Sequence, residues 1–232
     1  MFWLAAEIIE NAKKQHRKIL MEHESKSICL SYGIPVTNFK VAFSVDEAVK
    51  FAQEIGFPVV LKILSPDIIH KSDVGGVMLN LKSIDDVKKG YSAMIESVRR
   101  NVPNANILGV TVQEMVPPST EVIVGAIKDP QFGPVLMFGL GGVFVEVLQD
   151  VTFRVAPIKE RDAEEMVKEI KAYPLLKGFR SNPPANIDSI IRILVNTSKL
   201  VTENEEIAEL DLNPIMVNEK GAKVVDARII LE

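Results

Sequence analysis

The sequence predicts an α+β or α/β fold in which helices and strands alternate along the chain. Charged segments with apolar residues at helical spacing are interleaved, in both halves, with short runs of β-branched and aliphatic residues. Glycine and proline stand at several boundaries, as at Gly33, Gly56 and the pair Pro117 and Pro118. Interleaving of this kind is typical of these two fold classes.

Composition and charge limit the possible functions. With 232 residues and 47% hydrophobic side chains, the chain can bury a large core, either as one two-lobed unit or as two small domains. The net charge is −4 with both signs interspersed, which argues against a broad surface for phosphate backbones. Nucleic acid is therefore not an expected partner.

Nothing in the sequence indicates export or membrane insertion. Residues 1–11 are apolar, but Glu7 and Glu10 interrupt them and no basic segment precedes them, so they are not a signal peptide. No apolar run approaches the roughly 18 to 20 residues that span a bilayer. The single cysteine, Cys29, cannot form an internal disulfide. We therefore expect a cytoplasmic protein without membrane contact.

Local start and stop signals define the elements of the first half. Ser44 is a candidate helix N-cap with Glu47 at capping-box spacing. Pro58 opens VVLKIL, the pattern of a buried strand. The expected elements are two helices within residues 5–32, a strand at 36–43, a helix at 45–55, strands at 59–64 and 77–82, a helix capped by Ser83 that runs to about residue 101, and a strand at 107–115.

The second half continues the mixed pattern after the two prolines. Strands are expected at 121–127, 134–138 and 143–148, helices at 160–171 and 187–201, and a final β pair around residues 218–221.

A long polar loop, residues 65–76 (SPDIIHKSDVGG), joins the strands VVLKIL and VMLNLK and carries His70. An imidazole is often neutral near pH 7 and can attack phosphorus through a ring nitrogen. A lone loop histidine is also a common solvated surface residue. The loop ends in Gly75 and Gly76, which we expect to act as a hinge that lets the loop move.

Lys62 lies inside the strand VVLKIL, where alternation places Val60, Lys62 and Leu64 on one face. Burying an unpaired ammonium group costs several kcal/mol, so a carboxylate or a ligand phosphate should lie beside it. Both a structural ion pair and a phosphate contact fit this pattern.

The glycine run FGLGGVFVE follows a strand and includes Gly141 and Gly142, whose backbone amides could approach phosphate oxygens. It lacks the lysine and hydroxyl residue of a Walker loop, and a strand connection that needs positive φ angles explains it equally well. The segment Glu114, Met115 and Val116 could offer backbone groups to an adenine edge, or could be only a rigid linker.

The C-terminal segment places oxygen ligands of the kind that Mg²⁺ prefers on a probable hairpin. If the turn centres between Glu219 and Lys220, Asn213 faces Asp226, and Asp211 faces Arg228, with all four side chains on one face. A bulge at Gly221 would shift this register by one residue. Surface acids on a hairpin are the alternative to a metal site.

Together these segments resemble the β subunits of ADP-forming acetyl-CoA synthetases, archaeal-type NDP-forming acyl-CoA ligases, and more distantly the β subunit of succinyl-CoA synthetase. The likeness covers nearly the whole chain. It is carried by YGIPV, VVLK, SPDIIHKSDVGGV, QEMV, GLGGVFVE, ELDLNP and VVDARI, of which SPDIIHKSDVGGV is the most specific.

The resemblance implies an α+β ATP-grasp fold, in which two α+β lobes enclose the nucleotide. Residues 1–115 would form N-terminal helices and the smaller lobe with a phosphohistidine loop, and residues 116–232 the larger lobe with the magnesium site. The family's functional residues fall on His70 as catalytic residue, on Lys62, Glu114, Met115, Val116, Glu121, Gly141 and Gly142 for ATP or ADP, and on Asn213 and Asp226 for Mg²⁺. Whether Asp211 or Glu146 also acts there stays open.

The resemblance also implies a reaction and a partner. In such enzymes an acyl-CoA and phosphate give an acyl phosphate, a histidine of the α subunit takes the phosphoryl group, and the loop histidine of the β subunit relays it to ADP. CoA-binding and acyl-handling domains are absent from this sequence, so we expect an α subunit, in an α2β2 heterotetramer. The preferred acyl group and the choice between ADP and GDP stay open.

Two other functions are consistent with the same residues. A non-catalytic module that senses ADP or ATP would bind nucleotide without forming a labile phosphoprotein. A stand-alone ATP-grasp ligase that activates a carboxylate would turn over without a partner and without His70.

Overall fold

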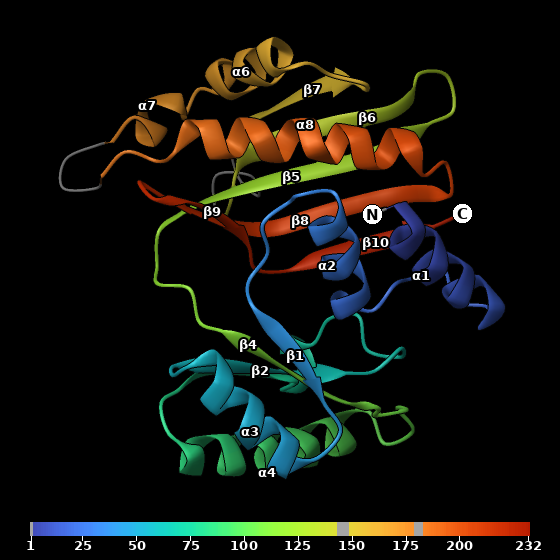
Figure 1. Cartoon of the computed structure of the whole chain (residues 1–232), viewed down its shortest axis with the longest axis vertical. Coiled ribbons are helices and arrows are strands. Elements are labelled where there is room, and N and C mark those ends of the chain that lie inside the picture. The colour runs from blue at the N-terminus through green and yellow to red at the C-terminus, as the bar shows by residue number, and fades with distance from the viewer. Residues whose placement is uncertain (1, 143–148, 179–182) are drawn as a thin grey trace. The chain divides into compact units, whose positions relative to one another are not determined.

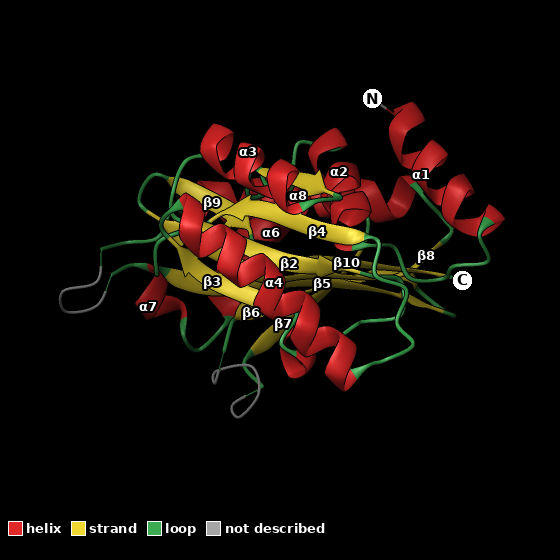
Figure 2. Cartoon of the chain, turned by 90° about the horizontal axis from the view of Figure 1, so that it is seen from below, coloured by secondary structure: helices red, strands yellow, loops and turns green. Residues whose placement is uncertain are grey.

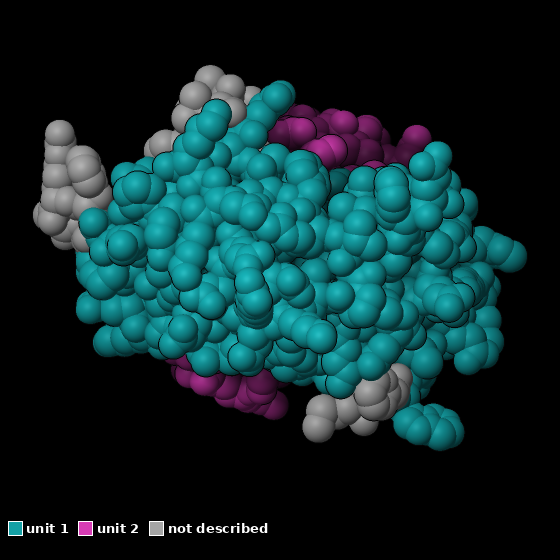
Figure 3. All heavy atoms as spheres, turned by 90° about the horizontal axis from the view of Figure 1, so that it is seen from above, with its two compact units in different colours: residues 1–36, 118–232 teal, residues 37–117 magenta. Residues whose placement is uncertain are grey.

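Two antiparallel sheets organise the fold, one in each of two units of the chain. The structure is a computed structural model that describes residues 2–142, 149–178 and 183–232. Unit 2 consists of residues 37–117, and unit 1 combines residues 1–36 with residues 118–232 (Figure 3). Each unit has its own sheet and its own helices (Figure 1).

Unit 2 is a four-stranded antiparallel sheet with two helices packed on it. The strand order is β1 (Phe39–Ala42), β4 (Gly109–Glu114), β2 (Val59–Leu64), β3 (Val77–Leu81). Helix α3 (Val45–Ile55) contacts β1 and β4, and α4 (Ile84–Asn101) runs across β2 and β3 (Figure 2). The predicted N-caps are confirmed, because the hydroxyls of Ser44 and Ser83 accept hydrogen bonds from the amides of Glu47 and Asp86, at 3.2 and 3.1 Å.

Strand β2 has two faces of different character, although all six of its residues are buried. Val59, Leu61 and Ile63 belong to the hydrophobic core that α3 and α4 complete. Because side chains alternate along a strand, Lys62 lies on the opposite face. The predicted alternation is therefore observed, with the lysine turned away from the helices.

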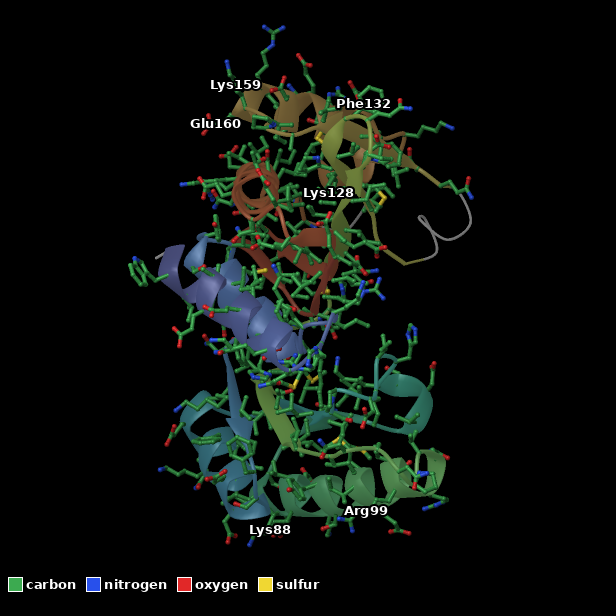
Figure 4. The ribbon with its side chains drawn as sticks, turned by 90° about the vertical axis from the view of Figure 1, so that its right-hand side faces the viewer. Lys88, Arg99, Lys128, Phe132, Lys159 and Glu160 are labelled. Atoms are coloured by element: carbon green, nitrogen blue, oxygen red, sulfur yellow. The ribbon has the colours of Figure 1, made fainter. Side chains whose placement is uncertain are left out.

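Unit 1 contains a longer antiparallel sheet that is covered by helices on one face. The strand order is β10 (Ala227–Leu231), β8 (Ile207–Asn218), β5 (Thr120–Asp129), β6 (Gly133–Leu140), β7 (Val151–Val155), and β9 (Gly221–Val224) pairs with β8. Helices α6 (Glu160–Glu169) and α8 (Ile187–Glu203) lie against the same face (Figure 4), and the short helix α7 (Tyr173–Leu176) follows α6. None of the helices in the described ranges is both long and apolar enough to cross a membrane.

The N-terminal helices α1 (Phe2–Lys14) and α2 (Glu22–Ser31) belong to unit 1, whereas the predicted division into residues 1–115 and 116–232 grouped them with residues 37–115. The backbone amides of Leu20 and Leu231 form hydrogen bonds of 3.0 and 2.7 Å to the carbonyls of Ile229 and Lys18. The amide of Val224 donates to the carbonyl of Pro35 at 2.9 Å. These contacts join residues about two hundred positions apart, so no local pattern indicated them.

Most of the other predicted elements are present with shifts of a few residues at their ends. The final β pair is longer than predicted, because β10 continues the pairing of β9 along β8. Strand β7 and helix α7 were not predicted. The strand predicted at 143–148 lies outside the described residues.

Candidate functional site

The predicted site residues fall into two groups, one in each unit. Unit 2 contains Lys62, His70 and the segment Glu114, Met115 and Val116, called the connector below. Unit 1 contains Glu121, the glycine loop with Gly141 and Gly142, and the hairpin residues Asn213 and Asp226.

Lys62 is the candidate phosphate ligand of unit 2. It lies in the middle of β2, paired with Val77 of β3 and Thr111 of β4, and is 5% exposed. A buried ammonium group is stable only beside anionic or polar groups, because its desolvation is costly. Its position on the face away from α3 and α4 therefore suits an anion on that face.

His70 is exposed on the loop that joins β2 to β3. Ile68, two residues earlier, is 7% exposed and belongs to the core of unit 2, whereas Ile69 is 46% exposed. After His70 the chain forms the short 3-10 turn η1 (Ser72–Val74). The imidazole is thus presented to solvent, where a reacting group can reach it.

The two glycines after η1, predicted as a hinge, are closely packed in the folded loop. A Cβ atom on Gly76 would lie 2.6 Å from Cγ2 of Ile63 and 2.9 Å from the carbonyl oxygen of Lys71. Gly75 has a φ of 71°, and a Cβ atom there would lie 2.3 Å from Oγ of Ser97. The amide of Gly76 also donates to the Lys71 carbonyl at 2.7 Å. These positions need glycine because the backbone is closely packed and hydrogen-bonded there.

The connector after β4 is already partly hydrogen-bonded within unit 2. The amide of Glu114 donates to the carbonyl of Asn38 at 2.9 Å, and the Glu114 carboxylate accepts from the Asn38 amide at 2.9 Å. The amide of Met115 donates to the carbonyl of Pro58 at 3.2 Å. A contact with an adenine edge would therefore fall to the carbonyl groups of this segment and to Val116.

Glu121 and the glycine loop, which are predicted separately, lie side by side in unit 1. The amide of Gly141 donates to the carbonyl of Glu121 at 2.8 Å, and a Cβ atom on Gly141 would lie 3.0 Å from Cβ of Glu121. Gly142 has a φ of 64°, which favours glycine. Glu146, the further candidate, lies outside the described residues.

The hairpin register predicted for Asn213 and Asp226 is observed. Met216 pairs with Lys223 in β9, and Asp211 pairs with Arg228 in β10, so the same register runs through both strands without a bulge at Gly221. The amide of Asn213 donates to the carbonyl of Asp226 at 3.2 Å. The backbones of the two candidate metal ligands are therefore adjacent across the hairpin.

A further acidic residue, Asp211, lies on the same hairpin beside Arg228. Burial raises the pKa of Asp211 above its usual value; Arg228, whose guanidinium lies 3.6 Å from the Asp211 carboxylate, opposes this shift and Asp226 adds to it. The described residues contain no cluster of three or more His, Cys, Asp or Glu side chains arranged to hold a metal. One carboxylate and one amide oxygen fit Mg²⁺ bound together with nucleotide phosphates, since this ion keeps several water and phosphate ligands.

Three side chains that support the His70 loop were not predicted. Ser97 and Asn101 of α4 donate hydrogen bonds to the carbonyl of Val74, both at 3.2 Å, and the Asp67 carboxylate accepts from the amide of Asn106 at 2.7 Å. Each of these side chains is 23 to 39 positions away in sequence from the residue to which it is hydrogen-bonded. No local sequence signal marks such contacts.

Comparison with known proteins agrees with this arrangement. A family model described as an ATP-grasp domain matches residues 11–231. The β subunit of acetate–CoA ligase (ADP-forming) I of Pyrococcus furiosus is 53% identical over 227 residues, which cover 98% of this chain and 97% of that subunit. The single-chain acetate–CoA ligase (ADP-forming) I of Archaeoglobus fulgidus is 48% identical, over 98% of this chain but 33% of that longer protein.

A similar chain is present in a solved structure of a ligand complex. It contains acetyl-coenzyme A synthetase 1 of Ca. Korarchaeum cryptofilum with coenzyme A and Mg-AMPPCP, and its phosphohistidine segment points towards the nucleotide-binding site. The matching chain is 53% identical, with a TM-score of 0.88, and the alignment covers 98% of this chain and 100% of that chain.

Replacing Gly76 by Ala should destabilise unit 2 by about 1 to 3 kcal/mol, because the added methyl group overlaps Ile63 and the Lys71 backbone. Gly90→Ala is the matched control: it lies within α4, where the new methyl group meets only side-chain atoms of Leu81 and Met78 and alanine favours helix. The free energy of unfolding of both variants is measured by denaturant titration. Equal stability of the two variants would contradict the close packing inferred at Gly76.

Replacing Asp226 by Asn should raise the Mg²⁺ concentration needed for half-maximal nucleotide binding at least about tenfold, an effect that even the loss of an outer-shell partner produces. Asn213→Ala should act in the same direction but less strongly, because it removes a neutral ligand. Glu219→Gln, an exposed carboxylate in the turn of the same hairpin, is the control. If magnesium titrations of all three variants coincide with the unmodified chain, Asn213 and Asp226 are ordinary surface residues.

Proposed function

Since the chain belongs to the ATP-grasp family of ADP-forming acetate–CoA ligase β subunits, we propose that it binds ADP or ATP with Mg²⁺ and relays a phosphoryl group between a partner subunit and the nucleotide through His70. The net reaction interconverts acyl-CoA, ADP and phosphate with the free acid, ATP and CoA.

The observation that carries this proposal is that unit 2 contains an exposed histidine, His70, close in the chain to a buried lysine, Lys62. The loop that bears His70 begins directly after β2, the strand that contains Lys62. Phosphoryl transfer depends on positioning and on neutralising charge, and these two residues supply a carrier and a positive charge from adjoining segments.

The relay consists of two substitutions at phosphorus. A ring nitrogen of His70 attacks a phosphohistidine of the partner; the new P–N bond forms as the partner's P–N bond breaks, and a proton passes to the departing imidazole. An oxygen of the β-phosphate of ADP then attacks the same phosphorus atom. The bond to His70 breaks, its ring nitrogen takes up a proton, and ATP leaves.

The other site residues bind the nucleotide in this proposal. Lys62 balances phosphate charge, the amides at Gly141 and Gly142 orient phosphate oxygens, and the segment that ends at Val116 contacts the adenine. Glu121 fixes the glycine loop through its contacts with Gly141. Asn213 and Asp226 hold Mg²⁺, which neutralises phosphate charge when it is bound.

The partner is an α subunit with CoA-binding and acyl-handling domains. The match to a named β subunit, and to one third of a single-chain ligase, supports such a partner. We further propose an α2β2 heterotetramer in the cytoplasm, a location that suits a chain whose single cysteine is a buried thiol.

Replacing His70 by Ala should abolish ATP synthesis from acyl-CoA, ADP and phosphate in the complex with the partner, while ADP affinity measured by calorimetry changes less than about threefold, because a carrier is not a binding anchor. His16→Asn is the control: His16 is an exposed histidine in unit 1 with a φ of 56°, which asparagine tolerates.

The result separates the rival functions. Full turnover of the His70→Ala variant, with or without a partner, would favour a stand-alone ligase. Nucleotide binding without turnover in the unmodified complex would favour a sensor.

A further inference from the structure

The loop that carries His70 is fixed on its N-terminal side. The Ser65 hydroxyl accepts a hydrogen bond from the Asp67 amide at 3.2 Å, and the Asp67 carboxylate accepts one from the Asn106 amide at 2.7 Å. Ile68 then enters the hydrophobic core of unit 2 and is 7% exposed. The chain is therefore held up to two residues before His70.

The loop is also fixed on its C-terminal side. The carbonyl of Val74 accepts hydrogen bonds from Ser97 Oγ and Asn101 Nδ2, both at 3.2 Å. Gly76 uses both of its backbone polar groups: its amide donates to Lys71 at 2.7 Å, and its carbonyl accepts from Ile63 of β2 at 2.8 Å. The chain is therefore held again one residue after His70.

Only Ile69 and His70 lie between these fixed points. The three residue steps from Ile68 to Lys71 span roughly 11 Å at most, so a segment whose two ends are held cannot swing far. The imidazole can still change direction by rotation about its side-chain bonds, which is fast in exposed residues.

The helix that provides two of the anchors is a firm support. Ser97 and Asn101 are four residues apart on α4 and therefore share one of its faces. Val87, Met94 and Val98 of the same helix are fully buried in the core of unit 2. Lys88 and Arg99 project from its outer side into solvent (Figure 4).

From these contacts, and given the function proposed above, we propose that Asp67, Ser97 and Asn101 are positioning residues that keep the His70 loop stationary during phosphoryl transfer. The side chain of His70 turns, whereas the loop stays in place.

The test compares two double variants in the complex with the partner subunit. Ser97→Ala with Asn101→Asp removes both donors to Val74, because an ionised carboxylate cannot donate a hydrogen bond. Ser92→Ala with Asn104→Asp is the matched control. The Ser92 hydroxyl donates to the carbonyl of Lys88 in its own helix at 3.2 Å, and Asn104 is exposed beyond the end of α4.

Loss of the anchors should lower kcat for ATP synthesis about tenfold or more and leave KM for ADP unchanged, since displacement of a reacting group by about 1 Å can cost a hundredfold in rate. The control should keep full kcat. Equal kcat in the two double variants would show that the anchors only stabilise the fold, and a higher kcat without anchors would show that the loop must move. His70→Ala is assayed in parallel. If this variant is active, the relay itself fails; if it is inactive, the comparison of kcat tests the anchors alone.

Hydrogen exchange of the unmodified complex provides a second test that needs no variant. During turnover, the amides of Ile63 and Gly76 should exchange as slowly as those in the middle of β2. Exchange at both positions that accelerates on addition of acyl-CoA, phosphate and Mg-ADP would overturn the proposal.

Discussion

The hydrogen bond from the Ile63 amide to the Gly76 carbonyl closes the His70 loop onto strand β2, and the arrangement of functional groups in unit 2 depends on it. Ile63 faces the core while its neighbour Lys62 faces the other way, so one strand both anchors the loop and presents the buried cation. Phosphoryl transfer needs such fixed relations, because it gains rate mainly from the positions of groups and charges.

In unit 1, strand pairing places the candidate metal ligands. The same register holds in β9, where Asn218 pairs with Gly221, and in β10, where Asp211 pairs with Arg228. Between these strands the Asn213 amide donates a 3.2 Å hydrogen bond to the Asp226 carbonyl. A shift of one residue would turn one of these side chains to the opposite face, where the helices lie. A two-residue metal site is sufficient here because nucleotide phosphates and water complete the coordination of Mg²⁺.

Features set by neighbours in sequence could be predicted, and features set by distant contacts could not. Ser44 and Ser83 cap helices through bonds to residues three positions on, and the alternation around Lys62 follows from strand geometry alone. The packing of residues 1–36 against the C-terminal strands depends on contacts across most of the chain. The close packing of Gly76 against Ile63 and Lys71 arises only in the folded loop, so its sequence context did not indicate it.

The central claim is that His70 carries the phosphoryl group covalently, and mapping the adduct tests it most directly. The chain is incubated with its partner, radiolabelled ATP and Mg²⁺, treated with acid or base, and digested for mass spectrometry. The account predicts an acid-labile, base-stable phosphoramidate on the peptide that contains residues 65–76, and its loss in His70→Ala. Label that is stable to acid, that lies on another peptide, or that persists in His70→Ala would contradict it.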